Sequence, residues 1–161
     1  MGPDGNAIFF SKEKFSLIKS YHHVLRMEDG AYTKSTVLIC ELEHLKTGKE
    51  ITFMVTHLKA KETPEFVEVR KNQSSHIIKL VNEMKNKKKT ANIILAGDFN
   101  ASLEEPAYQI VKQAGLTSAY ESVSGAEPGY TTWKVIRGKN LGRILKKMIS
   151  GERKERELSN K

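Results

Sequence analysis

A continuous apolar run constrains the fold of this chain more than any other feature. Residues 92–96 read Asn-Ile-Ile-Leu-Ala and stop abruptly at the polar segment Gly97-Asp98-Phe99-Asn100. Strands that are buried on both faces have this continuous apolar pattern, so the run predicts a covered strand followed by a loop. Loops that follow strands are where open α/β sheets bind their ligands. We therefore expect chemistry just beyond this strand.

Two further β-rich runs come earlier in the chain, at residues 36–43 and 51–58. The residues between them include Gly48, which suits a turn, so the two runs are expected to pair as an antiparallel hairpin. A shorter apolar run at residues 7–10 is bounded by a glycine and by charged residues. This pattern predicts one more buried strand.

Helical spacing begins at about Glu65 and continues to the lysine-rich residues 85–89. The apolar positions at i, i+3, i+4 and i+7 are Ile77, Leu80, Val81 and Met84. The lysines suit a helix end, because cations there oppose the negative end of the macrodipole. A second helix is predicted over residues 104–114, before Gly115. The order hairpin, helix, strand, helix indicates an α/β fold with layers on both sides of a sheet.

Composition suits one folded domain with a basic surface. The chain has 161 residues, a net charge of +8 and 39% hydrophobic residues. The charge favours phosphate-rich partners, although composition alone does not distinguish a nucleic acid from a nucleotide or from a merely solubilising surface. No apolar run approaches the roughly 20 residues of a membrane span. A single cysteine, Cys40, suits a reducing compartment, so we expect an intracellular location, cytoplasmic or mitochondrial.

The last part of the chain differs from the rest. Residues 138–161 are rich in Lys and Arg, and their large apolar side chains fit one narrow helical stripe. We expect a domain over residues 1–137 and a basic, largely solvated tail over residues 138–161.

Asp98 and Asn100 lie two residues apart directly after the predicted strand. A carboxylate in such a position orients and deprotonates a water molecule. A carboxamide donates hydrogen bonds to charge that develops on a phosphoryl oxygen. The alternative is that both side chains only make hydrogen bonds to the backbone of their own turn.

A second polar cluster follows the other strong strand. His57, Lys59 and Lys61 suit the binding of a phosphate through charge-assisted hydrogen bonds. Taken separately, a structural histidine and solvated lysines explain them as well. Their combination with Asp98 and Asn100 at a second strand end favours a phosphate site.

Five short segments, in order along the chain, resemble motifs of one known family. They are residues 2–10 with Asp-Gly-Asn-Ala, residues 55–61 with Thr-His-Leu-Lys, Arg70 with Gln73, residues 97–101 with Gly-Asp-Phe-Asn-Ala, and residues 130–134 with Tyr-Thr-Thr-Trp. The family is the endonuclease/exonuclease/phosphatase superfamily, and the resemblance is closest to its nocturnin-like deadenylases. It implies a two-sheet α/β sandwich and Mg2+-dependent cleavage of a phosphate ester. The implied substrate is NADP(H), which loses its 2′-phosphate, or poly(A) RNA.

The resemblance also implies roles for individual residues. The aspartate that matches Asp98 orients the attacking water, and the asparagine that matches Asn100 stabilises the transition state. The histidine that matches His57 contacts the scissile phosphate, while Lys59 and Lys61 match positions that contact substrate phosphates.

Several family residues have no counterpart here. The family's glutamate metal ligand lies well upstream of the Asp-Gly motif, and no Glu precedes Gly5. Its later ligands are an aspartate and an Asp-His pair, yet no Asp follows Asp98 and no His follows His76. We therefore expect a partial sandwich, incomplete at both ends, whose metal ligands are unknown and which is inactive as this chain. The alternative is a non-catalytic module that binds a nucleotide or RNA.

Overall fold

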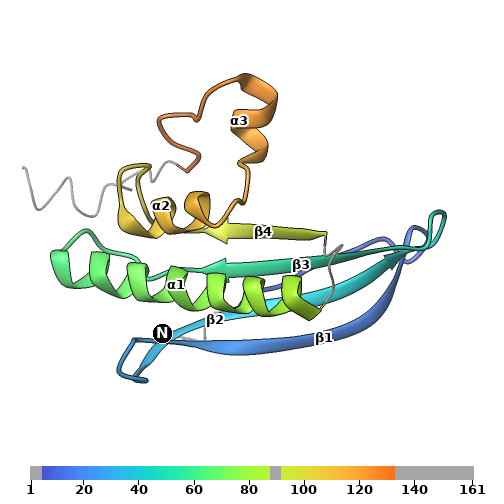
Figure 1. Cartoon of the computed structure of the whole chain (residues 1–161), viewed down its shortest axis with the longest axis horizontal. Coiled ribbons are helices and arrows are strands. Elements are labelled where there is room, and N and C mark those ends of the chain that lie inside the picture. Colours follow the sequence, from blue (N-terminus) through green and yellow to red (C-terminus); the bar gives the residue numbers. More distant parts are fainter. Residues whose placement is uncertain (1–4, 88–91, 133–161) are drawn as a thin grey trace, which may run out of the picture. The chain divides into compact units, whose positions relative to one another are not determined.

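The computed structural model describes residues 5–87 and 92–132 (Figure 1). Four strands form one sheet in the order β1-β2-β3-β4, accompanied by three helices. The elements are β1 Phe15–Arg26, β2 Tyr32–His44, β3 Lys49–His57, α1 Pro64–Lys87, β4 Ile93–Asp98, α2 Pro106–Gln113 and α3 Ala119–Ser124. All of them belong to the first of two units, residues 1–126 and 127–161. The predicted α/β class is confirmed.

β2 and β3 form the predicted hairpin. Their antiparallel ladder runs from the pair Val37 and Thr56 to the pair His44 and Lys49. The turn contains Gly48, whose φ of 65° lies in the left-handed region that glycine adopts without steric cost. The Gly48 N–H donates a 2.9 Å hydrogen bond to the His44 carbonyl, which closes the turn.

β4 pairs with β3 in parallel, from the pair Thr52 and Ile93 to the pair His57 and Asp98. Parallel strands need a long crossover between them, and α1 supplies it. This register brings the carboxyl ends of the two strands together, so the segments that follow them begin side by side.

One face of the sheet packs against α1 in an apolar cluster. Its completely buried members are Leu25, Val37, Ile39, Met54, Ile77, Val81 and Ala107. The predicted apolar face of α1 is confirmed, because Leu80 is buried as well and Met84 packs at the margin. Each fully buried large aliphatic side chain contributes about 1.5–3 kcal/mol to stability.

The opposite face of the sheet carries apolar side chains that are only partly covered. Ile94 is 46% exposed, and its neighbours Phe53 and Val55 are half-buried. The strand predicted at residues 92–96 is confirmed, but its burial on both faces is not observed. Ile93 and Leu95 pack against the cluster beneath α1, whereas Ile94 points to the other side, since strand side chains alternate.

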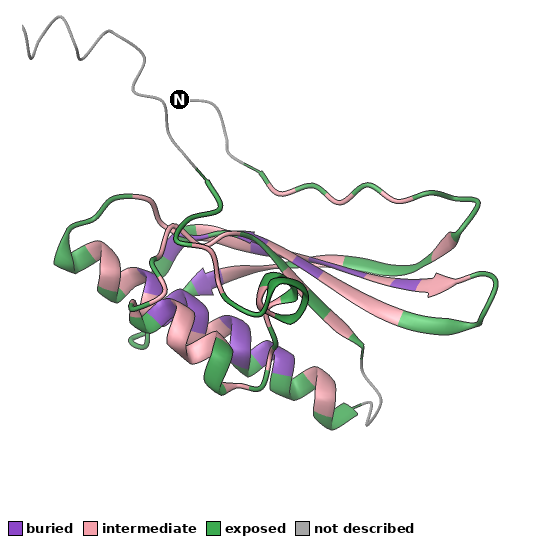
Figure 2. Cartoon of the chain, turned by 90° about the horizontal axis from the view of Figure 1, so that it is seen from above, coloured by how far each residue is buried: buried purple, intermediate pink, exposed green. Residues whose placement is uncertain are grey.

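The prediction of a strand at residues 7–10 is wrong. Residues 5–11 form no helix or strand, and Asn6 donates from Nδ2 to the carbonyl of Thr36 at 2.9 Å. The segment runs over the sheet on the side away from α1 (Figure 2). Phe9 is 94% exposed, while Ile8 and Phe10 are half-buried. The alternating burial is that of a strand, but no neighbouring strand pairs with this segment in the part of the chain that the structure describes.

β1 was not predicted from the sequence pattern. Its ladder with β2 shifts register between Leu17 and Lys19 and again between Val24 and Arg26. Such irregularities move side chains from one face to the other and break the two-residue alternation that marks a strand.

The predicted helix at residues 104–114 is confirmed as α2. Pro106 occupies its first turn and Glu105 is its extended N-cap residue, as expected for a helix start. The chain then leaves the helix at Gly115, whose φ is 74°. None of the helices in residues 5–87 and 92–132 has the length and apolar composition needed to cross a bilayer.

Some predicted features lie outside the described residues. They are the end of the lysine run at residues 88–89 and the basic segment 138–161 with its helical stripe. The boundary between residues 137 and 138 stays a prediction.

Gly97 provides a test of how closely β3 and β4 approach each other. Its φ is 135°, and a Cβ built on it would lie 1.9 Å from the Thr56 carbonyl oxygen. We expect Gly97→Ala to lower the free energy of unfolding by about 2 kcal/mol or more, because the backbone must move. Urea denaturation measures the loss. Gly129→Ala is the matched control, since nothing lies within 4 Å of that added carbon; equal stabilities of the two variants would contradict the close approach.

His76 gives the fold a pH dependence. Its Nδ1 accepts a 3.1 Å hydrogen bond from the Arg26 backbone N–H. Burial lowers the pKa of His76, as do the neighbouring charges of His23, Lys79 and Arg26, while Glu83 opposes them. The folded state therefore favours neutral His76, and its contribution to stability is lost as the pH falls below the unfolded pKa of about 6.5.

We expect the free energy of unfolding to fall between about pH 7.5 and pH 5.5, and to fall less in His76→Asn, which keeps an acceptor but does not titrate. Urea denaturation at both pH values measures the difference. His22→Asn, at an exposed position of β1, is the control and should retain the wild-type fall. An equal fall in wild type and His76→Asn would show that His76 does not carry this dependence.

Candidate functional site

His57 and Asp98 are brought together by the parallel pairing of β3 and β4. They are register partners at the last positions of the two strands. His57 Nε2 lies 3.9 Å from Asp98 Oδ2, and the two side chains are 56% and 38% exposed. An imidazole and a carboxylate at this separation, open to solvent, can hold one water molecule between them.

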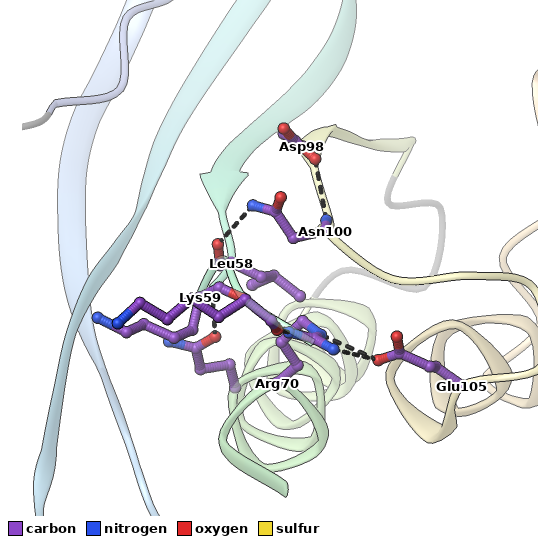
Figure 3. Close-up of polar contacts among 8 residues, drawn as sticks. Leu58, Lys59, Arg70, Asp98, Asn100 and Glu105 are labelled. Atoms are coloured by element: carbon purple, nitrogen blue, oxygen red, sulfur yellow. Dashed lines mark hydrogen bonds and ion pairs between the residues drawn. The ribbon is translucent and has the colours of Figure 1, made fainter. Parts of the chain in front are cut away.

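The turn after β4 fixes the side chains of Asp98 and Asn100. Asp98 Oδ1 accepts a 2.9 Å hydrogen bond from the Asn100 N–H. Asn100 has a φ of 48°, a left-handed conformation that asparagine tolerates, and its Nδ2 donates to the Leu58 carbonyl at 2.9 Å. Asp98 and Asn100 therefore do make hydrogen bonds to the backbone, as the alternative to a catalytic role predicted. Figure 3 shows the hydrogen bonds from Asn100 to Asp98 and to Leu58. They do not involve Asp98 Oδ2, which lies 3.9 Å from His57 Nε2.

Lys59 and Lys61 follow β3, and both extend their side chains over one aromatic ring of α1. Their Nζ atoms lie 5.4 Å and 5.2 Å from the ring centroid of Phe66. Two ammonium groups beside one ring, favoured there by cation–π attraction, form a local positive centre. The structure thus groups the predicted residues as His57 with Asp98 and as Lys59 with Lys61.

A buried polar network behind these residues was not assigned a role from the sequence. Arg70 is completely buried and bonds to Glu105 and to the carbonyls of Lys59 and Lys61. Gln73 is also completely buried, and its Oε1 accepts from the Lys59 N–H at 3.0 Å. The sequence could have indicated this network, because Arg70 and Gln73 lie on the same helical face as the apolar Ile77. Polar residues on an apolar face imply buried partners.

The described residues do not assemble a metal site. No group of three or more His, Cys, Asp or Glu side chains converges within residues 5–87 and 92–132. Asp98 already accepts a hydrogen bond through one oxygen, and Glu105 is engaged by Arg70. Residues 2–4, Trp133 and Lys134 of the family-like segments lie outside the described part of the chain.

Comparison with known proteins gives a consistent set of relatives. Nocturnin of Xenopus laevis is 35% identical over 140 residues, which are 83% of this chain and 35% of that protein. The Ccr4 3′-5′-exoribonuclease subunit of Kluyveromyces lactis is 24% identical, over 81% of this chain and 19% of that protein. The chain thus spans about a third of the nocturnin it matches. No protein-family model matches the chain.

Solved structures agree with this assignment. The human nocturnin catalytic domain with a bound sulfate anion matches with a TM-score of 0.68 and 29% identity, over 77% of this chain and 46% of that domain. An endonuclease/exonuclease/phosphatase family protein of Bacteroides thetaiotaomicron matches with a TM-score of 0.56 and 18% identity, over 66% and 39% of the respective chains. The expected partial fold of this type is confirmed. The chain therefore belongs to the endonuclease/exonuclease/phosphatase superfamily, as a nocturnin homologue that corresponds to part of the catalytic domain.

Proposed function

We propose that this chain carries the phosphate-binding and water-orienting residues of a nocturnin-type phosphoesterase. The observation that carries the proposal is the convergence of His57 and Asp98 at adjacent strand ends, 3.9 Å apart. Lys59 and Lys61 follow the first of these strands and place two positive charges near one ring. Two candidate substrates, NADP(H) losing its 2′-phosphate and poly(A) RNA, share a phosphate ester on the ribose of an adenosine.

In this proposal each residue acts through an atom that the turn leaves accessible. Asp98 orients and deprotonates a water through Oδ2, because Oδ1 is engaged by the Asn100 N–H. Asn100 has two amide donors, and Leu58 takes only one of them. The other donates to a phosphoryl oxygen as charge develops on it. His57 contacts the same phosphate from β3.

The family resemblance implies Mg2+, a cation that takes an octahedral set of oxygen ligands. The described residues do not fit this requirement, because no carboxylate cluster converges among them. We propose that the 161-residue chain binds the phosphate ester without hydrolysing it.

A second candidate is a non-catalytic module that binds a nucleotide or RNA. It is favoured by the same lack of a carboxylate cluster among the described residues together with the retained lysine pair. Sequence similarity to nocturnin and to the Ccr4 exoribonuclease subunit supports nucleotide or RNA ligands under both proposals. The two differ in whether Asp98 and Asn100 retain chemistry.

We also propose an intracellular location, cytoplasmic or mitochondrial. Cys40 is a free thiol that is 6% exposed. Burial raises the pKa of this thiol, so it stays protonated. A buried, protonated thiol without a disulfide partner suits a reducing compartment.

A chimera tests the catalytic proposal. The residues of this chain replace the matching part of the nocturnin catalytic domain, and hydrolysis of NADPH and of oligo(A) is measured with Mg2+. We expect turnover, with kcat lowered about 100-fold or more by Asp98→Asn and by Asn100→Ala, because each removes a group that acts in the transition state. Asn92→Ala, at the opposite end of β4, is the matched control and should retain full activity.

The outcomes separate the two candidate functions. A chimera that folds but does not turn over favours the binding module. Losses of less than about fivefold, or about 1 kcal/mol of transition-state stabilisation, would assign Asp98 and Asn100 to turn structure alone. The 161-residue chain by itself should not hydrolyse either substrate; Mg2+-dependent turnover that Asp98→Asn abolishes would contradict the binding-only proposal.

A titration tests the phosphate site in the 161-residue chain. We expect NADP+ to bind more tightly than NAD+, with affinity that falls as salt rises, because the contacts are ionic. Lys59→Ala combined with Lys61→Ala should weaken NADP+ binding about tenfold, equal to about 1.4 kcal/mol. Isothermal titration calorimetry measures both effects.

Two controls separate a specific site from general charge attraction. Lys12→Ala combined with Lys46→Ala removes the same charge at exposed positions outside the site and should leave binding within about twofold of wild type. A chain that ends at residue 137 lacks the basic segment and should still bind. Equal affinity for NADP+ and NAD+, or binding that disappears with residues 138–161, would end the phosphate-site proposal.

A further inference from the structure

The backbone of residues 58–61, here called the lysine segment, is held by side chains from outside it. The Leu58 carbonyl accepts from Asn100 Nδ2 at 2.9 Å, and the Lys59 N–H donates to Gln73 Oε1 at 3.0 Å. Arg70 Nη1 donates to the carbonyls of Lys59 at 3.0 Å and Lys61 at 2.6 Å. Loops are ordinarily mobile and solvated, so side chains that engage four backbone groups of one short segment fix its conformation unusually well.

Arg70 is the centre of this arrangement. Its side chain is completely buried, and its Nε and Nη2 donate to Glu105 Oε2 at 2.9 Å and 2.7 Å (Figure 3). The guanidinium therefore joins the lysine segment to the N-cap residue of α2. Because guanidinium donors are arranged in a rigid planar fork, the positions of the two carbonyls are set by the position of Glu105.

Gln73 anchors the same segment to the sheet. Its Nε2 donates to Thr33 Oγ1 at 2.9 Å, and Thr33 donates to the Leu25 carbonyl at 2.9 Å. Gln73 is completely buried and Thr33 is 8% exposed. The chain of hydrogen bonds thus passes from β1 and β2 through α1 to the amide of Lys59.

The conformation held in this way is one that the segment would rarely adopt by itself. Lys61 has a φ of 95°, in the left-handed region that residues with a side chain avoid. The carbonyl of this strained residue is bonded to Arg70. The ammonium groups of Lys59 and Lys61 both lie over Phe66, four residues before Arg70 on α1. One helix therefore sets both the backbone and the charged ends of the segment.

We infer that Arg70 and Gln73 are positioning residues, which hold Lys59 and Lys61 in the conformation that presents two ammonium groups to one phosphate. This inference rests on the proposed phosphate-binding function. Preorganisation raises affinity, because less side-chain and loop freedom is lost when the ligand binds. A merely structural role makes a different prediction: Arg70 and Gln73 would affect binding only by changing the folded fraction, whether or not the lysines are present.

The test combines Arg70→Lys with the lysine substitutions. Arg70→Lys keeps the charge but places all of its donors on one nitrogen, which cannot occupy the separate positions of Nε, Nη1 and Nη2 that contact Glu105 and the two carbonyls. We expect NADP+ affinity of the folded chain to fall about tenfold in this variant. The same substitution is then made in a chain that already carries Lys59→Ala and Lys61→Ala. There Arg70→Lys should change NADP+ affinity by less than twofold, because Arg70 acts only through the two lysines. Calorimetry measures affinity, and circular dichroism confirms that each variant is folded at the temperature used.

A second readout does not depend on a ligand. The side-chain methylene protons next to each ammonium, near the ring of Phe66, should show upfield ring-current shifts by NMR. Arg70→Lys and Gln73→Met should remove these shifts. Lys71→Met is the matched control, since Lys71 is the exposed neighbour of Arg70 and pairs with Glu68. Gln73→Met, which is neutral and similar in volume, replaces Arg70→Lys in the binding assay if the latter does not fold.

Each outcome decides one claim. An equal loss of NADP+ affinity with and without the lysines, or unchanged affinity in folded Arg70→Lys, would overturn the positioning inference. Wild-type chain that binds no NADP+ would overturn the proposed function. In that event the inference is judged by the ring-current shifts, and shifts that survive in both folded variants would overturn it as well.

Discussion

The burial of one guanidinium organises the elements around the candidate site. Arg70 is completely buried, and a buried charge without partners costs several kcal/mol. Its partners are Glu105 and the carbonyls of Lys59 and Lys61. These groups come from the start of α2 and from the segment after β3, so the position of α1 on the sheet is tied to both of them. The geometry of the lysine segment follows from this requirement.

The hydrogen bonds of the turn after β4 leave part of the hydrogen-bonding capacity of Asp98 and Asn100 unused within the turn. Asp98 uses one carboxylate oxygen to bond the Asn100 N–H and directs the other toward His57. Asn100 uses one amide donor to bond the Leu58 carbonyl, which joins the loops that follow the two strands. The turn bonds are what aim these side chains, because without them exposed Asp and Asn rotamers would be free to interconvert.

Membership of the superfamily and possession of its complete site are separate properties of this chain. The fold of the chain matches the nocturnin catalytic domain with a TM-score of 0.68, and the chain covers 46% of that domain. A carboxylate cluster is not found within residues 5–87 and 92–132. The sheet face away from α1 also keeps Ile94 half exposed. The described residues therefore share the fold of the superfamily without assembling a carboxylate cluster.

The sequence by itself determined the elements whose patterns are local. The hairpin, the apolar face of α1 and the apolar strand before Asp98 were predicted, because turn residues, the helical period of 3.6 residues and a continuous apolar run are all patterns of neighbouring residues. The same reasoning was wrong for residues 7–10, since a strand also needs a neighbour to pair with. It missed β1, where two register shifts break the alternation.

Tertiary structure alone decided which of the polar residues meet. His57 and Asp98 were chosen for their chemistry, yet only the parallel register of β3 and β4 places them 3.9 Å apart. The contact between Arg70 and Glu105 joins residues that are 35 positions apart in the chain. No periodicity encodes such a pairing, because it depends on where α1 and α2 come to lie on the sheet once the core has packed.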